Sequence, residues 1–124
     1  MVPHEFVLDM LYPLAYRTKK MFGNYAIYVG DKIVLATRQK EDNPVDNGLW
    51  IGTKLEHHTI LKEMFPSLRN LETYKIKTWL LLPEDALDFE ETTLKITELI
   101  KQNSTLIGNI PPPRKPRNQR GGSE

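Results

Sequence analysis

The chain has 124 residues, of which 40% are hydrophobic, and a formal net charge of +1 at pH 7, which suits a single globular domain with a buried core. It contains no cysteine, so disulfides, thiolate zinc sites and cysteine nucleophiles are excluded and a reducing compartment is favoured. The first residues do not form a signal peptide, and the longest apolar run, residues 79–82, is too short to span a bilayer, so we expect a cytoplasmic protein without membrane contact.

A first helix is predicted over residues 3–16, because apolar residues recur there at helical spacing. Pro13 lies inside this pattern and should kink or end the helix near Tyr12. A short basic cluster follows, and positive charge near a helix C-terminus is favourable. The alternative role for this cluster is phosphate binding. Its members are Arg17, Lys19 and Lys20.

A β-hairpin is the clearest predicted element. Residues 25–29 and 32–37 are rich in β-branched and aromatic side chains, and the two-residue link Gly30-Asp31 is typical of a tight turn with positive φ at the glycine. Gly23 is expected to turn the chain into the first of these strands. The polar residues 38–48 predict a loop, and residues 49–52 predict a third strand.

The second half of the chain predicts two further helices and two strands. Thr53 and Glu56 form a capping box, so the second helix should begin at residue 54. Strands are expected over residues 71–75 and 78–82. Asp88 is the expected N-cap of a third helix that ends near residue 103. The predicted inner faces of the two helices are Leu55, His58, Leu61, Met64 and Phe65, and Phe89, Thr93, Ile96 and Ile100.

The pattern thus predicts an α+β domain over residues 1–108, in two layers, with the order helix, three strands, helix, two strands, helix and an antiparallel sheet under the helices. Residues 109–124 are rich in proline and basic side chains and predict a disordered tail. Four basic residues against Glu124 give this tail a net charge of 4 − 1 = +3, which leaves 1 − 3 = −2 for the body. The four are Arg114, Lys115, Arg117 and Arg120.

The sequence holds no recognisable catalytic motif. Adjacent His57 and His58 point in different directions on a helix and do not make a metal site together. The carboxylates near residue 88 are explained by helix capping. Trp50 and Trp79 favour packing over a base-stacking platform, because few basic residues are interleaved with them. We expect no cofactor and no bound metal.

Three segments resemble the N-terminal domain of the TfoX/Sxy family. They are residues 6–14, residues 20–28 with a basic residue before Met-Phe-Gly and an aromatic strand, and residues 77–87 with a strand that ends in proline and an acidic residue. The resemblance spans about residues 5–103. It implies a two-layer α+β domain with an antiparallel sheet, here without the C-terminal domain of the family's competence regulators, which assist transcription. It implies no catalytic residues.

We therefore expect a non-enzymatic regulatory domain that acts through contact with a protein partner or a second copy of itself. Weak, sequence-independent nucleic-acid contact is a further expectation, through Arg17, Lys19 and Lys20 and through Arg114, Lys115, Arg117 and Arg120 of the tail. The alternative function is a small-molecule binding or enzymatic domain, with a site between the sheet and the 38–48 loop.

Overall fold

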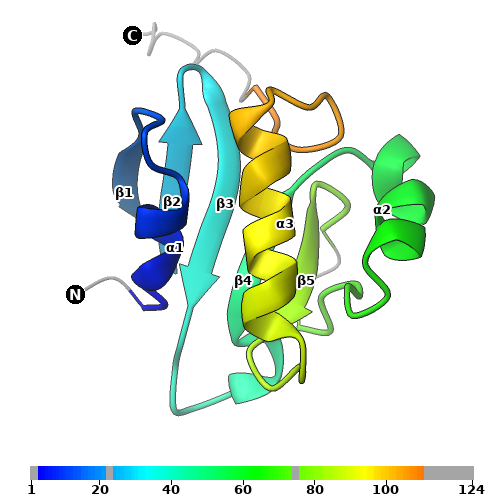
Figure 1. Cartoon of the computed structure of the whole chain (residues 1–124). Helices are drawn as coiled ribbons and strands as arrows, with labels where there is room; N and C mark the ends of the chain where they lie inside the picture. The colour runs from blue at the N-terminus through cyan, green and yellow to red at the C-terminus, as the bar shows by residue number, and fades with distance from the viewer. Residues whose placement is uncertain (1–2, 22–23, 74–75, 111–124) are drawn as a thin grey trace, which may run out of the picture.

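The computed structural model describes residues 3–21, 24–73 and 76–110, and these residues form an α+β fold (Figure 1). Each strand of the antiparallel sheet pairs with its neighbour in the chain, in the order β1-β2-β3-β4-β5. The predicted fold class is confirmed. The strands are β1 (Arg17–Met21), β2 (Asn24–Val29), β3 (Lys32–Arg38), β4 (Gly48–Gly52) and β5 (Trp79–Pro83), the helices are α1 (Phe6–Met10), α2 (His58–Met64) and α3 (Phe89–Lys101), and the 3₁₀ turns are η1 (Pro44–Asp46) and η2 (Leu55–His57).

Helices α1 and α3 cover one face of the sheet, and the main core lies between them and the strands (Figure 1). The inner face predicted for the third helix is confirmed, because its four residues are all buried. The opposite side of α3 is charged, and Lys95 pairs there with Glu91 at 3.3 Å. The fully buried strand residues of this core are Ile27, Leu35, Leu49, Ile51, Leu80 and Leu82.

The predicted hairpin is formed by β2 and β3. Gly30 in its turn has φ 58°, as the turn chemistry predicted. The pairing shifts between Ile27 and Tyr28, so β3 contains one residue more than the opposing strand segment. The extra residue allows Val34 and its neighbour Leu35 both to join the main core.

The other face of the sheet carries a second, smaller hydrophobic cluster. The rings of Trp50 and Trp79 meet there edge to face, with centroids 5.9 Å apart, and both are almost completely buried. Leu71, from the segment after α2, packs on them. The predicted packing role of the two tryptophans is therefore confirmed, because neither exposes a face on which a base could stack.

The first helix is shorter than predicted, and the prediction for the basic cluster at its end was wrong. Helix α1 ends at Met10, and Arg17–Met21 form strand β1 instead of a helix terminus. Pro13 supplies no backbone N–H for a longer helix, and pairing with β2 offers the following residues a hydrogen-bonding partner. Four strands thus precede α2 and one follows it. Residues 71–73 are not in a strand, and residues 74–75 of the expected strand lie outside the described residues.

The capping box predicted at Thr53 was also wrong. Thr53 is fully buried, and its hydroxyl donates to the carbonyl oxygen of Leu106 at 2.8 Å, while α2 begins only at His58, after η2. Leu55 and Met64, predicted to face inward, are 57% and 43% exposed. Helix α3 begins where predicted, but no N-terminal N–H of the helix bonds to the carboxylate of Asp88.

That carboxylate instead accepts hydrogen bonds from two hydroxyls, at 2.6 Å from Ser67 and 2.9 Å from Thr92. At the other end of the domain, Asn109 pairs with Ile33, so the folded part extends past the boundary predicted at residue 108. Gly23 and residues 111–124 lie outside the described residues.

We predict that Gly48→Ala destabilises the fold by about 3 kcal/mol or more, a loss typical of serious backbone conflict. Gly48 has φ 143°, and a Cβ there would overlap the carbonyl oxygen of Leu82 and lie 2.8 Å from the amide nitrogen of Glu84. Gly30→Ala is the matched control, because that glycine also has positive φ but open space around it, and should lose about 1–2 kcal/mol. Urea unfolding measures both, and equal losses would contradict the prediction.

Candidate functional site

Strand β1 lies at one edge of the sheet and carries the basic cluster noted in the sequence (Figure 1). Its residues 17–20 are all exposed. In the described part of the chain, its backbone is paired with β2 alone, so its outer edge forms no backbone hydrogen bond. An edge of this kind offers N–H and C=O groups to another extended chain.

The side chains of β1 present positive charge on both faces of the sheet. Arg17 lies opposite Tyr28, and its guanidinium stands 4.9 Å from the centre of that ring and donates to the carbonyl oxygen of Gly30 at 3.2 Å. Lys19 shares this face, and Lys20 points to the other, because successive strand residues alternate. Within the described residues, none of these three cations forms an ion pair with a carboxylate.

The structure thus brings Arg17 and Lys19 together and separates Lys20 from them. The four tail residues predicted to contact nucleic acid, Arg114, Lys115, Arg117 and Arg120, lie outside the described residues.

A groove of about 490 Å³ lies where the alternative hypothesis places a ligand site, beside the 38–48 loop. Turn η1 and the following residue form one wall, the segment after α2 forms the second, and the end of β5 forms the third. Three of its side chains are carboxylates and one is a guanidinium, so the charge of the groove is negative. The lining residues are Pro44, Val45, Asn47, Arg69, Glu72, Pro83, Glu84 and Asp85.

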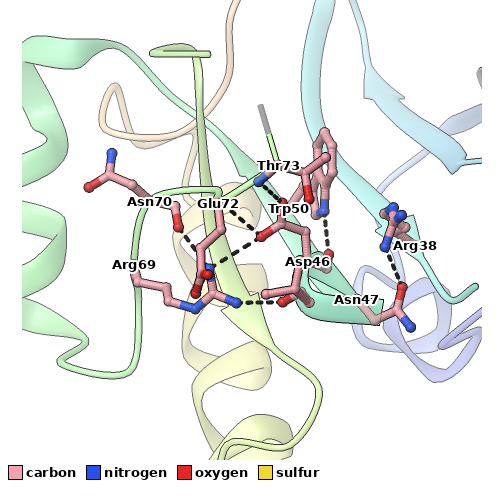
Figure 2. Close-up of polar contacts among 9 residues, drawn as sticks. Arg38, Asp46, Asn47, Trp50, Arg69, Asn70, Glu72 and Thr73 are labelled. Carbon is pink, nitrogen blue, oxygen red and sulfur yellow. Dashed lines mark hydrogen bonds and ion pairs between the residues drawn. The ribbon is translucent and has the colours of Figure 1, made fainter. Parts of the chain in front are cut away.

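A buried carboxylate holds two of these walls together (Figure 2). Asp46 is fully buried and accepts hydrogen bonds from the backbone N–H of Glu72 at 3.0 Å and of Thr73 at 2.7 Å, and from Arg69 at 3.2 Å. Burial raises the pKa of Asp46, but these hydrogen bonds outweigh it, so the pKa lies below its ordinary value. The backbone oxygen of Asp46 accepts from the Trp50 indole N–H at 2.9 Å.

Arg38 lies beside this anchor and is 2% exposed. Its Nη1 donates to Oδ1 of Asn47 at 2.6 Å, while its Nε has no hydrogen-bond partner (Figure 2). The amide of Asn47 also bonds the backbone N and O of Lys40, at 3.0 and 2.7 Å. These contacts hold both ends of the loop against the sheet, and they fix Asn47, which lines the groove.

Sequence reasoning missed both Asp46 and Arg38. Asp46 and Asn47 stood in a turn signal, which predicts local hydrogen bonds to the backbone. The residues that donate hydrogen bonds to the Asp46 carboxylate lie more than twenty residues further along the chain, and no local sequence pattern predicts them.

The histidines make separate local contacts, although His57 and His58 are adjacent in the sequence. Nε2 of His4 lies 3.1 Å from Oε1 of Glu84, and the imidazole packs at a tilt of 57° against the ring of Phe89, with centroids 5.1 Å apart. His58 is buried, and this burial lowers the pKa of its imidazole. In the part of the chain that the structure describes, no three or more histidine and carboxylate side chains gather where they could hold a metal ion.

Comparisons with models of protein families, with curated proteins and with solved structures gave no match. Among the described residues, no helix has the length and apolar character needed to cross a membrane.

We predict that Asp46→Asn lowers the free energy of unfolding by about 3 kcal/mol at pH 7, because the backbone N–H groups of Glu72 and Thr73 lose a charged acceptor and the ion pair with Arg69 is lost. Because the pKa of Asp46 in the folded protein lies below its ordinary value of 3.8, the stabilisation is complete above pH 3.8 and is lost as the pH falls through the folded-state pKa. Urea unfolding from pH 7 to pH 2 should show the two proteins converging in acid. Asp42→Asn, in the exposed part of the same loop, is the control and should match the wild type.

Proposed function

We propose that this domain is a non-enzymatic regulatory module that binds a protein partner along strand β1. The observation that carries the proposal is the open backbone edge of β1, lined by three cations that have no carboxylate partner among the described residues.

A partner segment can add to this edge as a further strand, because its main chain can pair with the outer N–H and C=O groups of β1. The side chains of an added strand alternate between the two faces of the sheet. Acidic residues at successive positions would therefore meet Arg17 and Lys19 on one face and Lys20 on the other. The favoured partner is an extended segment rich in aspartate and glutamate.

Charge also selects against a second copy of the chain at this edge. Antiparallel pairing of two β1 strands would bring cations of one copy opposite cations of the other, and directly opposed like charges destabilise strand pairs. An acidic partner gains attraction from the same residues. The TfoX/Sxy resemblance of residues 6–14, 20–28 and 77–87 supports a regulatory role for this contact.

We predict that a synthetic extended peptide with glutamates at successive positions binds the protein and that Lys19→Glu combined with Lys20→Glu weakens it at least tenfold, since the two substitutions reverse the charge on both faces of the edge. Fluorescence anisotropy measures the affinity, and slowed hydrogen exchange at the β1 amides locates the peptide. Lys95→Glu on the outer face of α3 is the control and should change the affinity less than twofold.

Equal affinity for all three proteins would contradict strand addition at β1. A duplex DNA that binds more tightly than the peptide, with the same dependence on Lys19 and Lys20, would replace the protein partner by nucleic acid.

The groove beside η1 supports a second candidate function, the binding of a small cationic molecule. Its volume of about 490 Å³ is in the range of ligand sites. Arg69 is already bonded to Asp46 and to the backbone oxygens of Asn70 and Val45, whereas the Asp85 side chain forms no hydrogen bond or ion pair among the described residues. The free carboxylate favours an amine or guanidine ligand.

We predict that guanidinium and amine fragments shift the NMR amide signals of Val45 and Asp85 in a saturable manner. Asp85→Asn should weaken this binding about tenfold, the loss expected for one charge-assisted hydrogen bond. Asp31→Asn, in the distant hairpin turn, is the matched control. Shifts that do not saturate, or that persist unchanged in Asp85→Asn, would count against this candidate.

A further inference from the structure

A second groove, of about 300 Å³, lies at the end of the sheet that holds the β2–β3 turn. It combines the first residue of β3, the residue before η2 and the segment that follows α3. Among the described residues, none of those that line it carries a carboxylate. The lining residues are Lys32, Lys54, Thr105, Gly108, Asn109 and Ile110.

The wall formed by the segment after α3 is fixed by a series of hydrogen bonds. The Thr53 hydroxyl holds the carbonyl oxygen of Leu106 at 2.8 Å, and the N–H of Gly108 donates to Gly52 at 2.6 Å. The side-chain amide of Asn109 donates to the carbonyl oxygen of Thr53 at 2.6 Å, and its backbone pairs with Ile33. The groove is therefore attached to the end of the sheet at several points and is formed before any ligand arrives.

Gly108 also positions the side chain of Lys32. It has φ 104°, and a Cβ at this position would lie 3.1 Å from Cδ of Lys32 and 3.3 Å from Cγ1 of Val34. The aliphatic part of Lys32 thus packs against bare backbone, which limits its rotamers. Its Nζ makes one long hydrogen bond, at 3.4 Å to Oδ1 of Asn103, and retains donors for a ligand.

Lys32 and Lys54 differ from Lys95 and Lys101 of α3 in their ionic partners. Lys95 and Lys101 pair with glutamates at 3.3 and 2.9 Å, whereas neither lysine of this groove has an acidic partner in the described ranges. Two ammonium groups in one groove repel each other unless an anion lies between them. Thr105 also lines the groove, and a threonine hydroxyl is a neutral hydrogen-bond donor.

We propose that this groove binds a phosphate group, held by the ammonium groups of Lys32 and Lys54 and the hydroxyl of Thr105. Lysine is a common point-charge ligand for phosphate, and the anion would relieve the repulsion between the two cations. Arg114 and Lys115 follow Ile110 closely in the sequence. The phosphate can belong to a small phosphorylated molecule or to a nucleic-acid backbone.

The test uses the full chain and pyrophosphate as the probe. NMR titration should show saturable shifts at the amides of Thr105, Gly108 and Asn109. Lys32→Gln and Lys54→Gln should each lower the affinity about tenfold, the value of one lost charged contact. Lys32→Arg, which keeps the charge, should retain most of the binding, and Lys95→Gln should match the wild type. Lys54 and Lys95 are exposed and Lys32 is half-buried, and a thermal melt checks that each variant is folded.

A parallel titration with duplex DNA separates the two sources of phosphate. Pyrophosphate binding that DNA does not displace assigns the groove to a small ligand. DNA binding that needs Lys32 and Lys54 and is displaced by pyrophosphate assigns it to a nucleic-acid backbone. The proposal is overturned if pyrophosphate shifts do not saturate, or if Lys95→Gln weakens binding as much as Lys32→Gln. Because none of these residues lies on β1, failure here leaves the acidic-peptide experiment unaffected.

Discussion

The packing on the second face of the sheet depends on the hydrogen bonds and the ion pair that the Asp46 carboxylate forms. It is buried, and its two backbone hydrogen bonds and one ion pair hold residues 69–73 against the start of β4 (Figure 2). Leu71 lies inside that segment and packs on Trp50 and Trp79. The hydrogen bonds of Asp46 therefore also hold Leu71 in this hydrophobic cluster. A buried charge is tolerated here because two backbone N–H groups and the guanidinium of Arg69 donate hydrogen bonds to it.

The same anchor limits which edge of the sheet is open. Arg69 belongs to the anchored segment, and its backbone pairs with Leu81 through bonds of 2.9 and 2.7 Å, which occupies part of the outer edge of β5. Strand β1 at the opposite edge has no such cover within the described ranges, and positive side chains occupy it instead. Charged residues on an edge strand discourage uncontrolled pairing, while they still permit pairing with a segment of opposite charge.

Local patterns predicted the parts of this fold that depend on neighbours in the chain. The Gly30-Asp31 turn and the start of α3 at Phe89 were correct, because turn chemistry and helix periodicity are local properties. The capping box at Thr53 failed because a distant carbonyl oxygen, that of Leu106, takes the hydroxyl. Strand β1 was missed because five mostly polar residues become a strand only when β2 is beside them. Likewise, Lys32 and Lys54 are separated in the sequence, and only the fold places them in one groove.

The distribution of charge over the fold makes the candidate sites chemically distinct. The groove beside η1 has a negative lining, with Glu72, Glu84 and Asp85, whereas the cations of β1 and of the second groove lack acidic partners among the described residues. A net charge near zero therefore conceals regions of opposite sign, and net charge alone would have argued against any charged partner. In physiological salt, electrostatic interactions between exposed charges are screened beyond about 8 Å. An anion bound at β1 or between the two lysines is therefore attracted by the positive charges beside it and is little affected by the net charge of the whole chain.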